Sequence, residues 1–163
     1  MSPAVQTPAF AQWLAGARQA AQQPPAQPRT PLVVAGHQVG SVAAGVLDDI
    51  GLQRLLDKRE QLYFQERNGA FAWHLPVPDA EVTPALNALA AALRQVGRCG
   101  PWRDEQLAVT NVQGAVVGTV ERGAVRVLGI ATRAVHLVGL APDGRMWVQR
   151  RSLNKPNHPG KWD

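Results

Sequence analysis

The helical and strand-like segments of this chain do not alternate regularly, and their order limits the folds that it can adopt. Residues 8–22 carry apolar side chains at helical spacing, and similar spacing returns over residues 46–58 and again after Thr83. The remaining apolar residues follow strand-like patterns that glycine and proline interrupt. This order predicts an α+β fold, a small mixed domain of hairpins and two to three helices, rather than a doubly wound sheet.

The first part of the chain predicts a helix followed by a linker. Thr7-Pro8 combines a capping side chain with a first-turn proline, which is typical of a helix start. We therefore expect residues 1–23 to be an N-terminal helix. Residues 24–30 hold three prolines and no large apolar side chain, so they predict a stiff Pro/Gln linker. The helix is then an appendage to the body of the protein.

The body begins with segments that predict a strand, a helix and a hairpin. Residues 31–43 are expected to be one strand, and residues 46–58 a short helix. Asn68-Gly69 tolerates positive φ at both central positions of a tight turn. Residues 61–65 and 70–75, which flank this dipeptide, are therefore expected to pair as a hairpin.

The clearest helical pattern in the sequence follows Thr83-Pro84, a second cap-plus-proline start. Its apolar face consists of Leu86, Leu89, Ala90, Leu93 and Val96. Beyond this helix, residues 106–112 and 115–120 predict two strands. Residues 121–128 fit either a short helix or more strand.

The last part of the sequence predicts a second hairpin and a loop. Residues 135–141 and 145–151 are strand-like, and Pro142-Asp143-Gly144 supplies the restricted and permissive backbone positions of a tight reversal. Residues 152–163 have no apolar periodicity, so we expect them to form a loop.

The positive charge of the chain is concentrated in its last quarter. The formal net charge is +5, but residues 1–121 hold nine Lys/Arg against ten Asp/Glu, whereas residues 122–163 hold eight against two. A nucleic-acid-binding domain usually spreads its cations over one face, while a fragment that stops before an acidic segment has this asymmetry. We favour the second interpretation, so nucleic acid is not the expected partner.

Several classes of protein are excluded by what the sequence lacks. No run of about 18 uncharged apolar residues is present, so no membrane span is expected. Cys99 is the single cysteine and no secretory signal pattern occurs, which predicts a cytoplasmic protein without disulfides. There is no cysteine pair, no Gly-rich phosphate loop and no His-Glu-x-x-His, and the four histidines are scattered. We predict no metal ligand and no catalytic residue in this chain.

Cations and aromatic side chains gather in the second hairpin and the loop after it. The candidates for substrate binding are Trp147, Arg150, Arg151, Lys155 and Trp162. An arginine fork fixes phosphate oxygens and an indole stacks on a base or heterocycle, so these residue types suit a nucleotide-like diphosphate. A solvated basic strand with a core tryptophan is the plainer alternative, which the residues alone leave open.

The same region resembles a known family. The segments that carry the resemblance are Val135-His136-Leu137, Trp147-Val148-Gln149-Arg150-Arg151-Ser152, Lys155 and Pro159-Gly160-Lys161-Trp162-Asp163. They are similar to the start of Nudix hydrolase domains in the subgroup linked to thiamine pyrophosphokinase. Upstream segments resemble the extra N-terminal domain of that subgroup: Arg54-Leu55-Leu56, Trp102-Arg103-Asp104-Glu105 and Glu121-Arg122. The resemblance covers most of residues 30–163.

This resemblance implies a division of the body and an activity. Residues 31–132 would be the N-terminal α+β domain, and residues 133–163 the incomplete start of the Nudix domain with its first β-hairpin. The full-length protein would hydrolyse a small molecule of the nucleoside- or thiamine-diphosphate type with Mg²⁺ or Mn²⁺. The family's box, Gly-Gly followed by a helix bearing Arg-Glu-x-x-Glu-Glu, does not occur in the sequence. We therefore expect these 163 residues alone to be catalytically inert.

Two other functions stay open at this point. The chain could be a stand-alone basic module that binds nucleic acid or an acidic partner, with an affinity that falls steeply as salt rises. Alternatively, the N-terminal domain could serve the enzyme as a dimerisation or substrate-cover element, which leaves a homodimer among the expectations.

Overall fold

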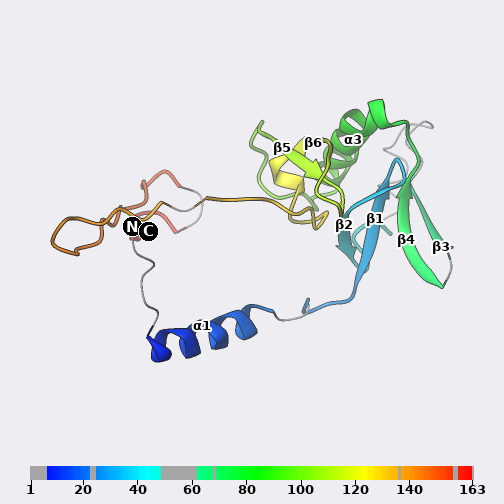
Figure 1. The fold of residues 1–163 in the computed structure, drawn as a ribbon. Helices are drawn as coiled ribbons and strands as arrows, with labels where there is room; N and C mark the ends of the chain where they lie inside the picture. The colour runs from blue at the N-terminus through cyan, green and yellow to red at the C-terminus, as the bar shows by residue number, and fades with distance from the viewer. Residues whose placement is uncertain are drawn as a thin grey trace. The chain divides into compact units, whose positions relative to one another are not determined.

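A computed structural model describes residues 7–22, 25–48, 62–67, 69–135, 137–155 and 158–162. The chain divides into two compact units, residues 1–132 and 133–163, which are described separately. The first unit combines helices with a four-stranded and a two-stranded sheet (Figure 1). The predicted α+β class is confirmed. In the part of the chain that is described, no helix is long and apolar enough to cross a membrane.

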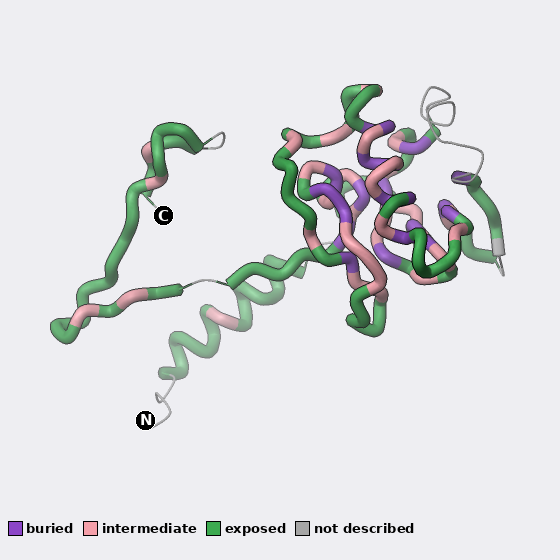
Figure 2. The backbone as a smooth tube through the Cα atoms, turned by 90° about the horizontal axis from the view of Figure 1, so that it is seen from above, coloured by how far each residue is buried: buried purple, intermediate pink, exposed green. Residues whose placement is uncertain are grey.

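The first helix, α1, spans Pro8–Ala21, and its start is the one that the sequence predicts. Thr7 is extended, and its Oγ1 accepts a hydrogen bond from the Phe10 N–H at 3.3 Å. This bond satisfies one of the N–H groups that helix geometry leaves without an intrahelical partner. Phe10 and Trp13 stack with ring centroids 5.7 Å apart, although no residue of α1 is buried (Figure 2). The cap and the contacts within the helix therefore stabilise α1.

Residues 31–43, expected to be one strand, belong to two. β1 (Arg29–Val34) and β2 (His37–Ala43) pair antiparallel across Ala35-Gly36. Both turn residues have positive φ, 50° for Ala35 and 79° for Gly36, as a two-residue hairpin turn of this type requires. The single-strand prediction was wrong because alanine seldom adopts left-handed backbone, so Ala35 carried no turn signal.

The larger sheet has the strand order β2-β1-β4-β3. β3 (Tyr63–Arg67) and β4 (Ala70–Leu75) form the hairpin that Asn68-Gly69 predicts. β1 pairs with β4 in parallel, and it begins at Arg29, inside the segment 24–30 that we expected to be linker. The helix predicted over residues 46–58 falls mostly on residues 49–58, which lie outside the described residues.

The predicted central helix is present as α3 (Val82–Gln95). Thr83, which we predicted as the cap of this helix, does not cap it. One turn of 3₁₀-helix, η1 (Asp79–Glu81), directly precedes α3 and sets the helix start. Thr83 lies inside the helix, and its Oγ1 accepts a hydrogen bond from the Thr119 N–H at 2.9 Å. The Thr83 cap prediction was therefore wrong, whereas the prediction of the helix and its apolar face is confirmed.

The two strands predicted after the helix are confirmed as β5 (Gln106–Thr110) and β6 (Val116–Glu121), which pair antiparallel. Asn111 closes the turn between them, since its Oδ1 accepts from the N–H groups of Gln113 and Ala115 at 3.1 and 2.9 Å. The ambiguous segment after β6 starts with another 3₁₀ turn, η2 (Arg122–Ala124).

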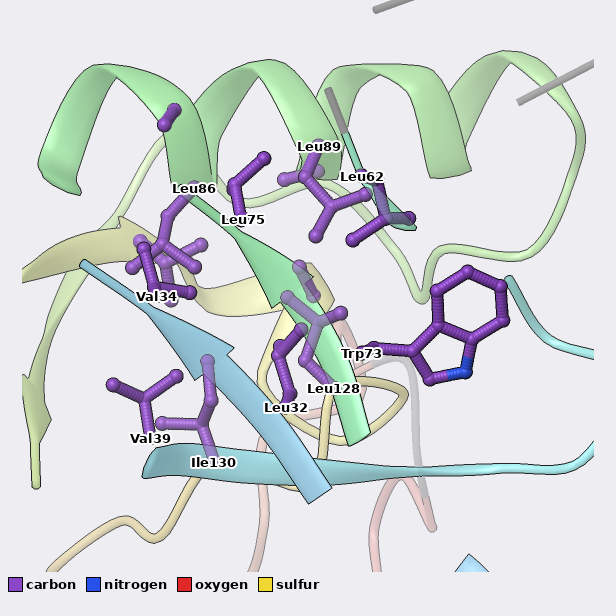
Figure 3. Packing of buried hydrophobic residues seen from close by; sticks show 14 of the residues in the cluster. Leu32, Val34, Val39, Leu62, Trp73, Leu75, Leu86, Leu89, Leu128 and Ile130 are labelled. Carbon is purple, nitrogen blue, oxygen red and sulfur yellow. The ribbon is translucent and has the colours of Figure 1, made fainter. Parts of the chain in front are cut away.

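One apolar core joins α3 to both sheets. Figure 3 shows Leu86 and Leu89 of α3 directed toward Leu75 of β4 and Val34 of β1. Further buried members include Leu32, Val42, Trp73, Val109, Val120, Leu128 and Ile130. Each buried leucine or valine stabilises the fold by roughly 1.5–3 kcal/mol relative to exposure, so this cluster is what holds the first unit together.

Polar side chains of α3 cover the edge of β6 that faces away from β5. The Thr119 N–H donates to Thr83 Oγ1, and the Glu121 N–H donates to Asn87 Oδ1 at 3.0 Å. Asn87 Nδ2 in turn donates to the Thr119 carbonyl at 3.3 Å. These contacts satisfy backbone groups of a strand edge that would otherwise need solvent or another strand.

Gly118 lets α3 approach β6 this closely. A Cβ on Gly118 would lie 2.9 Å from Val82 Cγ1 and 3.0 Å from Thr83 Oγ1. We expect Gly118→Ala to lower the free energy of unfolding by about 1–2 kcal/mol, measured by urea denaturation. Gly16→Ala is the matched control, because nothing lies within 4 Å of that Cβ and alanine favours a helix. A Gly118→Ala protein as stable as wild type would show that the close approach is unimportant.

Candidate functional site

The second unit contains the tight reversal that Pro142-Asp143-Gly144 predicts. The Ala141 N–H donates to the Arg145 carbonyl at 2.8 Å, and Leu140 and Met146 form an isolated bridge. The turn is confirmed, but the described arms carry bridges rather than the two regular strands that we expected. Two strands without neighbours are marginally stable in water, which accounts for the short pairing.

Trp147 lines an open cavity of about 190 Å³ beside this turn. The other described residues that line it are Ala141, Arg145 and Met146. The indole lies across Gly139, where an added Cβ would be 3.3 Å from Trp147 Cδ1. Arg145 is ion-paired with Asp143 at 2.7 Å, so its charge is largely offset. The cavity therefore suits an apolar or aromatic group better than an anion.

A second cavity, of about 230 Å³, brings together two of the candidate substrate-binding residues, Arg151 and Trp162. Among the described residues, His158 and Lys161 also line it. The Arg151 N–H donates to the Lys161 carbonyl at 2.8 Å, and the Gly160 N–H donates to the Arg151 carbonyl at 3.2 Å. These backbone bonds place the far end of the loop beside the hairpin arm, and two cations share one cavity as a result.

The other two candidates do not line either cavity. Arg150 Nε donates to the Gly160 carbonyl at 2.9 Å, and Arg150 forms a bridge with Trp162. Arg150 therefore holds the loop against the arm. Lys155 is exposed, and its N–H donates to the Ser152 carbonyl at 3.1 Å in the preceding turn.

His158 and Lys161 were missed as members of the site by the reasoning from sequence. His158 adopts a φ of 48°, an uncommon conformation for a residue with a side chain, and histidine is one of the residue types enriched there. Lys161 could have been predicted as a member of the site, because it is the neighbour of the candidate Trp162 in the sequence. No sequence signal pointed to His158, because its position depends on how the loop returns to Arg151.

In the first unit, Glu121 is a buried carboxylate with 1% of its surface exposed. Its oxygens accept hydrogen bonds from the backbone N–H groups of Arg103, Gly123 and Glu105 at 2.8, 3.1 and 3.2 Å. Burial alone raises the pKa of this carboxyl, but the three hydrogen bonds and the charge of Arg94 outweigh it and lower the pKa below its ordinary value. Glu121 is thus an ionised structural carboxylate.

Cys99 is a half-buried thiol, and the described acidic residues do not cluster with it. Burial and the charge of Glu121 raise the pKa of the Cys99 thiol against the opposing effect of Arg94, so the thiol is protonated at neutral pH and is a poor nucleophile. Among the residues that the structure describes, no three His, Cys, Asp or Glu side chains gather where they could hold a metal ion. The described residues therefore do not fit a divalent cation.

No family model matches this chain, and no curated protein matches it significantly in sequence.

Proposed function

We propose that this chain is the N-terminal part of a Nudix-type hydrolase whose full-length form hydrolyses a substrate of the nucleoside- or thiamine-diphosphate type. Residues 31–132 supply the N-terminal domain, and residues 133–163 supply the first hairpin of the hydrolase domain. The proposal starts from the resemblance of the segments around Arg150-Arg151-Ser152 and Pro159-Gly160 to that family.

The observation that carries the proposal is the apolar character of both faces of the hairpin. Alternate residues of an extended arm point to opposite faces. Counted from the bridge between Leu140 and Met146, this alternation groups these two residues with Val138 and Val148, and groups Leu137 with Trp147 on the opposite face. Exposure of these side chains ranges from 52% to 99%. Apolar surface on both faces is typical of strands that a folded domain covers on both sides.

A hydrolase domain around the hairpin accounts for this surface. Further strands and helices of that domain would bury both faces, at roughly 25 cal/mol per Å² of apolar surface. Arg150, Arg151 and Lys155 would then lie near the substrate phosphates, and Trp147 and Trp162 would pack or stack. In that family the glutamates of the box hold Mg²⁺ or Mn²⁺, and we assign no catalytic residue to this chain.

The gene's reading frame beyond codon 163 tests the proposal first. We expect it to encode Gly-Gly followed by a helix bearing Arg-Glu-x-x-Glu-Glu. A protein extended through that helix should hydrolyse nucleoside or thiamine diphosphates in the presence of Mg²⁺, while these 163 residues alone should not. The control is the extended protein with the box glutamates replaced by glutamine, which should be inactive. An in-frame stop codon at this point, or an extended protein without diphosphate hydrolysis, would overturn the proposal.

A basic module that binds nucleic acid or an acidic partner is the second candidate. The exposure of Trp147 and Trp162, at 76% and 71%, beside several cations favours it. It predicts oligonucleotide binding that weakens steeply between low and high salt, measurable by fluorescence anisotropy. A basic binding module gives no role to the exposed aliphatic side chains of Val135 and Leu137, so we rank this function second.

A further inference from the structure

We propose that two copies of this chain form a dimer by exchanging their first helices. In this dimer the aromatic face of α1 packs against the exposed pair Phe64–Phe71 of the second copy. Both surfaces belong to the first unit, so the dimer goes beyond the proposed function and does not depend on the hydrolase domain.

The surface on the sheet is an aromatic pair of the β3–β4 hairpin. Phe64 and Phe71 stack with ring centroids 5.2 Å apart and an angle of 4° between their planes. Phe64 also contacts Trp73, its partner across the two strands, which is buried. Phe64 and Phe71 themselves are 50% and 54% exposed. The aromatic cluster therefore begins in the core and continues into solvent on the same face of the sheet.

The surface on α1 is the apolar face of a helix that buries none of its residues. Phe10, Trp13, Leu14 and Ala17 recur at the spacing of one helix face. A helix of 14 residues is only marginally stable in water by itself, and packing of this face stabilises it. Aromatic rings on both surfaces gain from offset or edge-to-face packing in addition to the burial of apolar area. The two surfaces are therefore of matching chemistry.

The segment between α1 and β1 favours a second copy over the same chain. Residues 22–28 include three prolines, whose fixed φ favours an extended backbone. β1 runs parallel to β4, and Leu32 pairs with Trp73, so this segment reaches the sheet at the end where Phe71 lies.

An extended segment of seven residues spans roughly 20 Å, which separates the end of α1 from Phe71 of the same chain by a similar distance. The stiff segment would have to fold back for α1 to pack on its own sheet. A second copy receives the helix while the segment stays extended, which is the geometry of an exchanged element.

Charge and symmetry agree with this pairing. Arg18 is the only charged residue of α1, and it lies one turn beyond Leu14 at the flank of the apolar face. Glu66 is exposed and pairs with Phe71 across the hairpin. The Gly69 N–H donates to Glu66 Oε1 at 3.1 Å, a bond that positions the carboxylate but carries no opposite charge. A twofold dimer uses each contact twice. Few side chains take part in each contact, so we expect a weak dimer with a micromolar dissociation constant.

Sedimentation equilibrium of the full chain over a range of concentrations tests the dimer. We expect a monomer–dimer equilibrium that Trp13→Ala or Phe71→Ala weakens about tenfold or more, because each removes an aromatic ring from both contacts. Gln19→Ala, on the opposite face of α1, is the matched control for the helix. Tyr63→Ala is the control for the sheet, since it removes an exposed ring that stacks on His74 on the opposite face of β3. Both controls should change the dissociation constant by less than about twofold.

Mixing the Trp13→Ala and Phe71→Ala proteins separates loss of the contact from misfolding. A mixed dimer has one contact in which the helix and the sheet are both intact, so the mixture should associate more strongly than either variant alone. No gain on mixing would rule out the exchange.

Three further results would overturn the proposal. One is a monomer at all concentrations, which would mean that α1 does not pack on a second copy. Another is a dimer that Trp13→Ala and Phe71→Ala leave unchanged, which would place the contact elsewhere, as at the exposed hairpin of the second unit. The third is equal weakening by the controls. None of these results bears on hydrolysis by the extended protein, so the dimer and the proposed function fail independently.

Discussion

Replacing Glu121 by alanine is expected to lower the free energy of unfolding by about 4 kcal/mol. The substitution removes the acceptor of the N–H groups of Arg103, Gly123 and Glu105 and leaves them poorly satisfied next to the core. Urea denaturation followed by tryptophan fluorescence measures the change. A loss below about 1 kcal/mol would mean that water replaces the carboxylate without difficulty.

Glu121→Gln is the matched variant, and it also isolates the charge. Its side-chain oxygen can keep the two bonds that Oε1 accepts, from Arg103 and Gly123, while its NH₂ group faces the Glu105 N–H. We therefore expect about half of the loss caused by alanine.

The dependence of stability on pH provides a second measurement on Glu121. The pKa of this carboxyl is lower in the folded protein than its ordinary value of 4.5. Its contribution to stability is therefore complete above pH 4.5 and is lost as the pH falls through the folded pKa. The wild-type protein should lose more stability than Glu121→Gln over this acidic range. Parallel curves for the two proteins would contradict the assignment.

Asn87→Ala is the second substitution with a large expected effect, a loss of about 3 kcal/mol in the free energy of unfolding. Asn87 exchanges hydrogen bonds with the side chain of Gln106, at 3.1 and 3.0 Å, and also bonds the backbone of Thr119 and Glu121. Alanine leaves the edge of β6 without these partners. Hydrogen exchange of the Glu121 amide should accelerate in this variant more than exchange in β1.

Gln95→Ala is the control for Asn87. Gln95 is also on α3 but is exposed, so its replacement should change the free energy of unfolding by less than about 0.5 kcal/mol. Equal effects of the two substitutions would indicate a general loss of helix stability rather than an uncovered strand edge.

Local chemistry was sufficient to predict several elements. Thr7 has a hydroxyl at the position where a helix start needs an acceptor, and it caps α1. Asn68-Gly69 predicted the β3–β4 hairpin because few dipeptides tolerate its turn. The apolar face from Leu86 to Leu93 predicted the buried side of α3. In each case neighbouring residues determine the conformation, so a single sequence contains the needed information.

Predictions failed where tertiary contacts opposed the local preference of a residue. Ala35 occupies a left-handed turn position that its side chain disfavours, and the pairing of β1 with both β2 and β4 maintains it. Thr83 has the chemistry of a cap, but the approach of β6 gives its hydroxyl a different partner. Tertiary contacts outweighed local preference at both positions.

The candidate site divides in the same way. Arg151 and Trp162 were predicted from residue type, because guanidinium and indole groups suit a phosphorylated ring. Their association with Lys161 and His158 depends on the pairing of residue 151 with residue 161, and no local pattern specifies that register. Arg150 has the same residue type as Arg151, yet the Gly160 carbonyl gives it a different role.

The sequence by itself determined the α+β class, the helices α1 and α3, the β3–β4 hairpin, the turn at residues 142–144 and the basic, aromatic character of residues 133–163, because these depend on spacing and on intrinsic backbone preference. Only the tertiary structure decided the strand order β2-β1-β4-β3, the burial of Glu121 and the cover of β6 by Asn87. These features join residues far apart in the chain. The hydrogen bonds and burial that stabilise these features become strong only after packing has excluded water. A pattern of neighbouring residues therefore does not predict them.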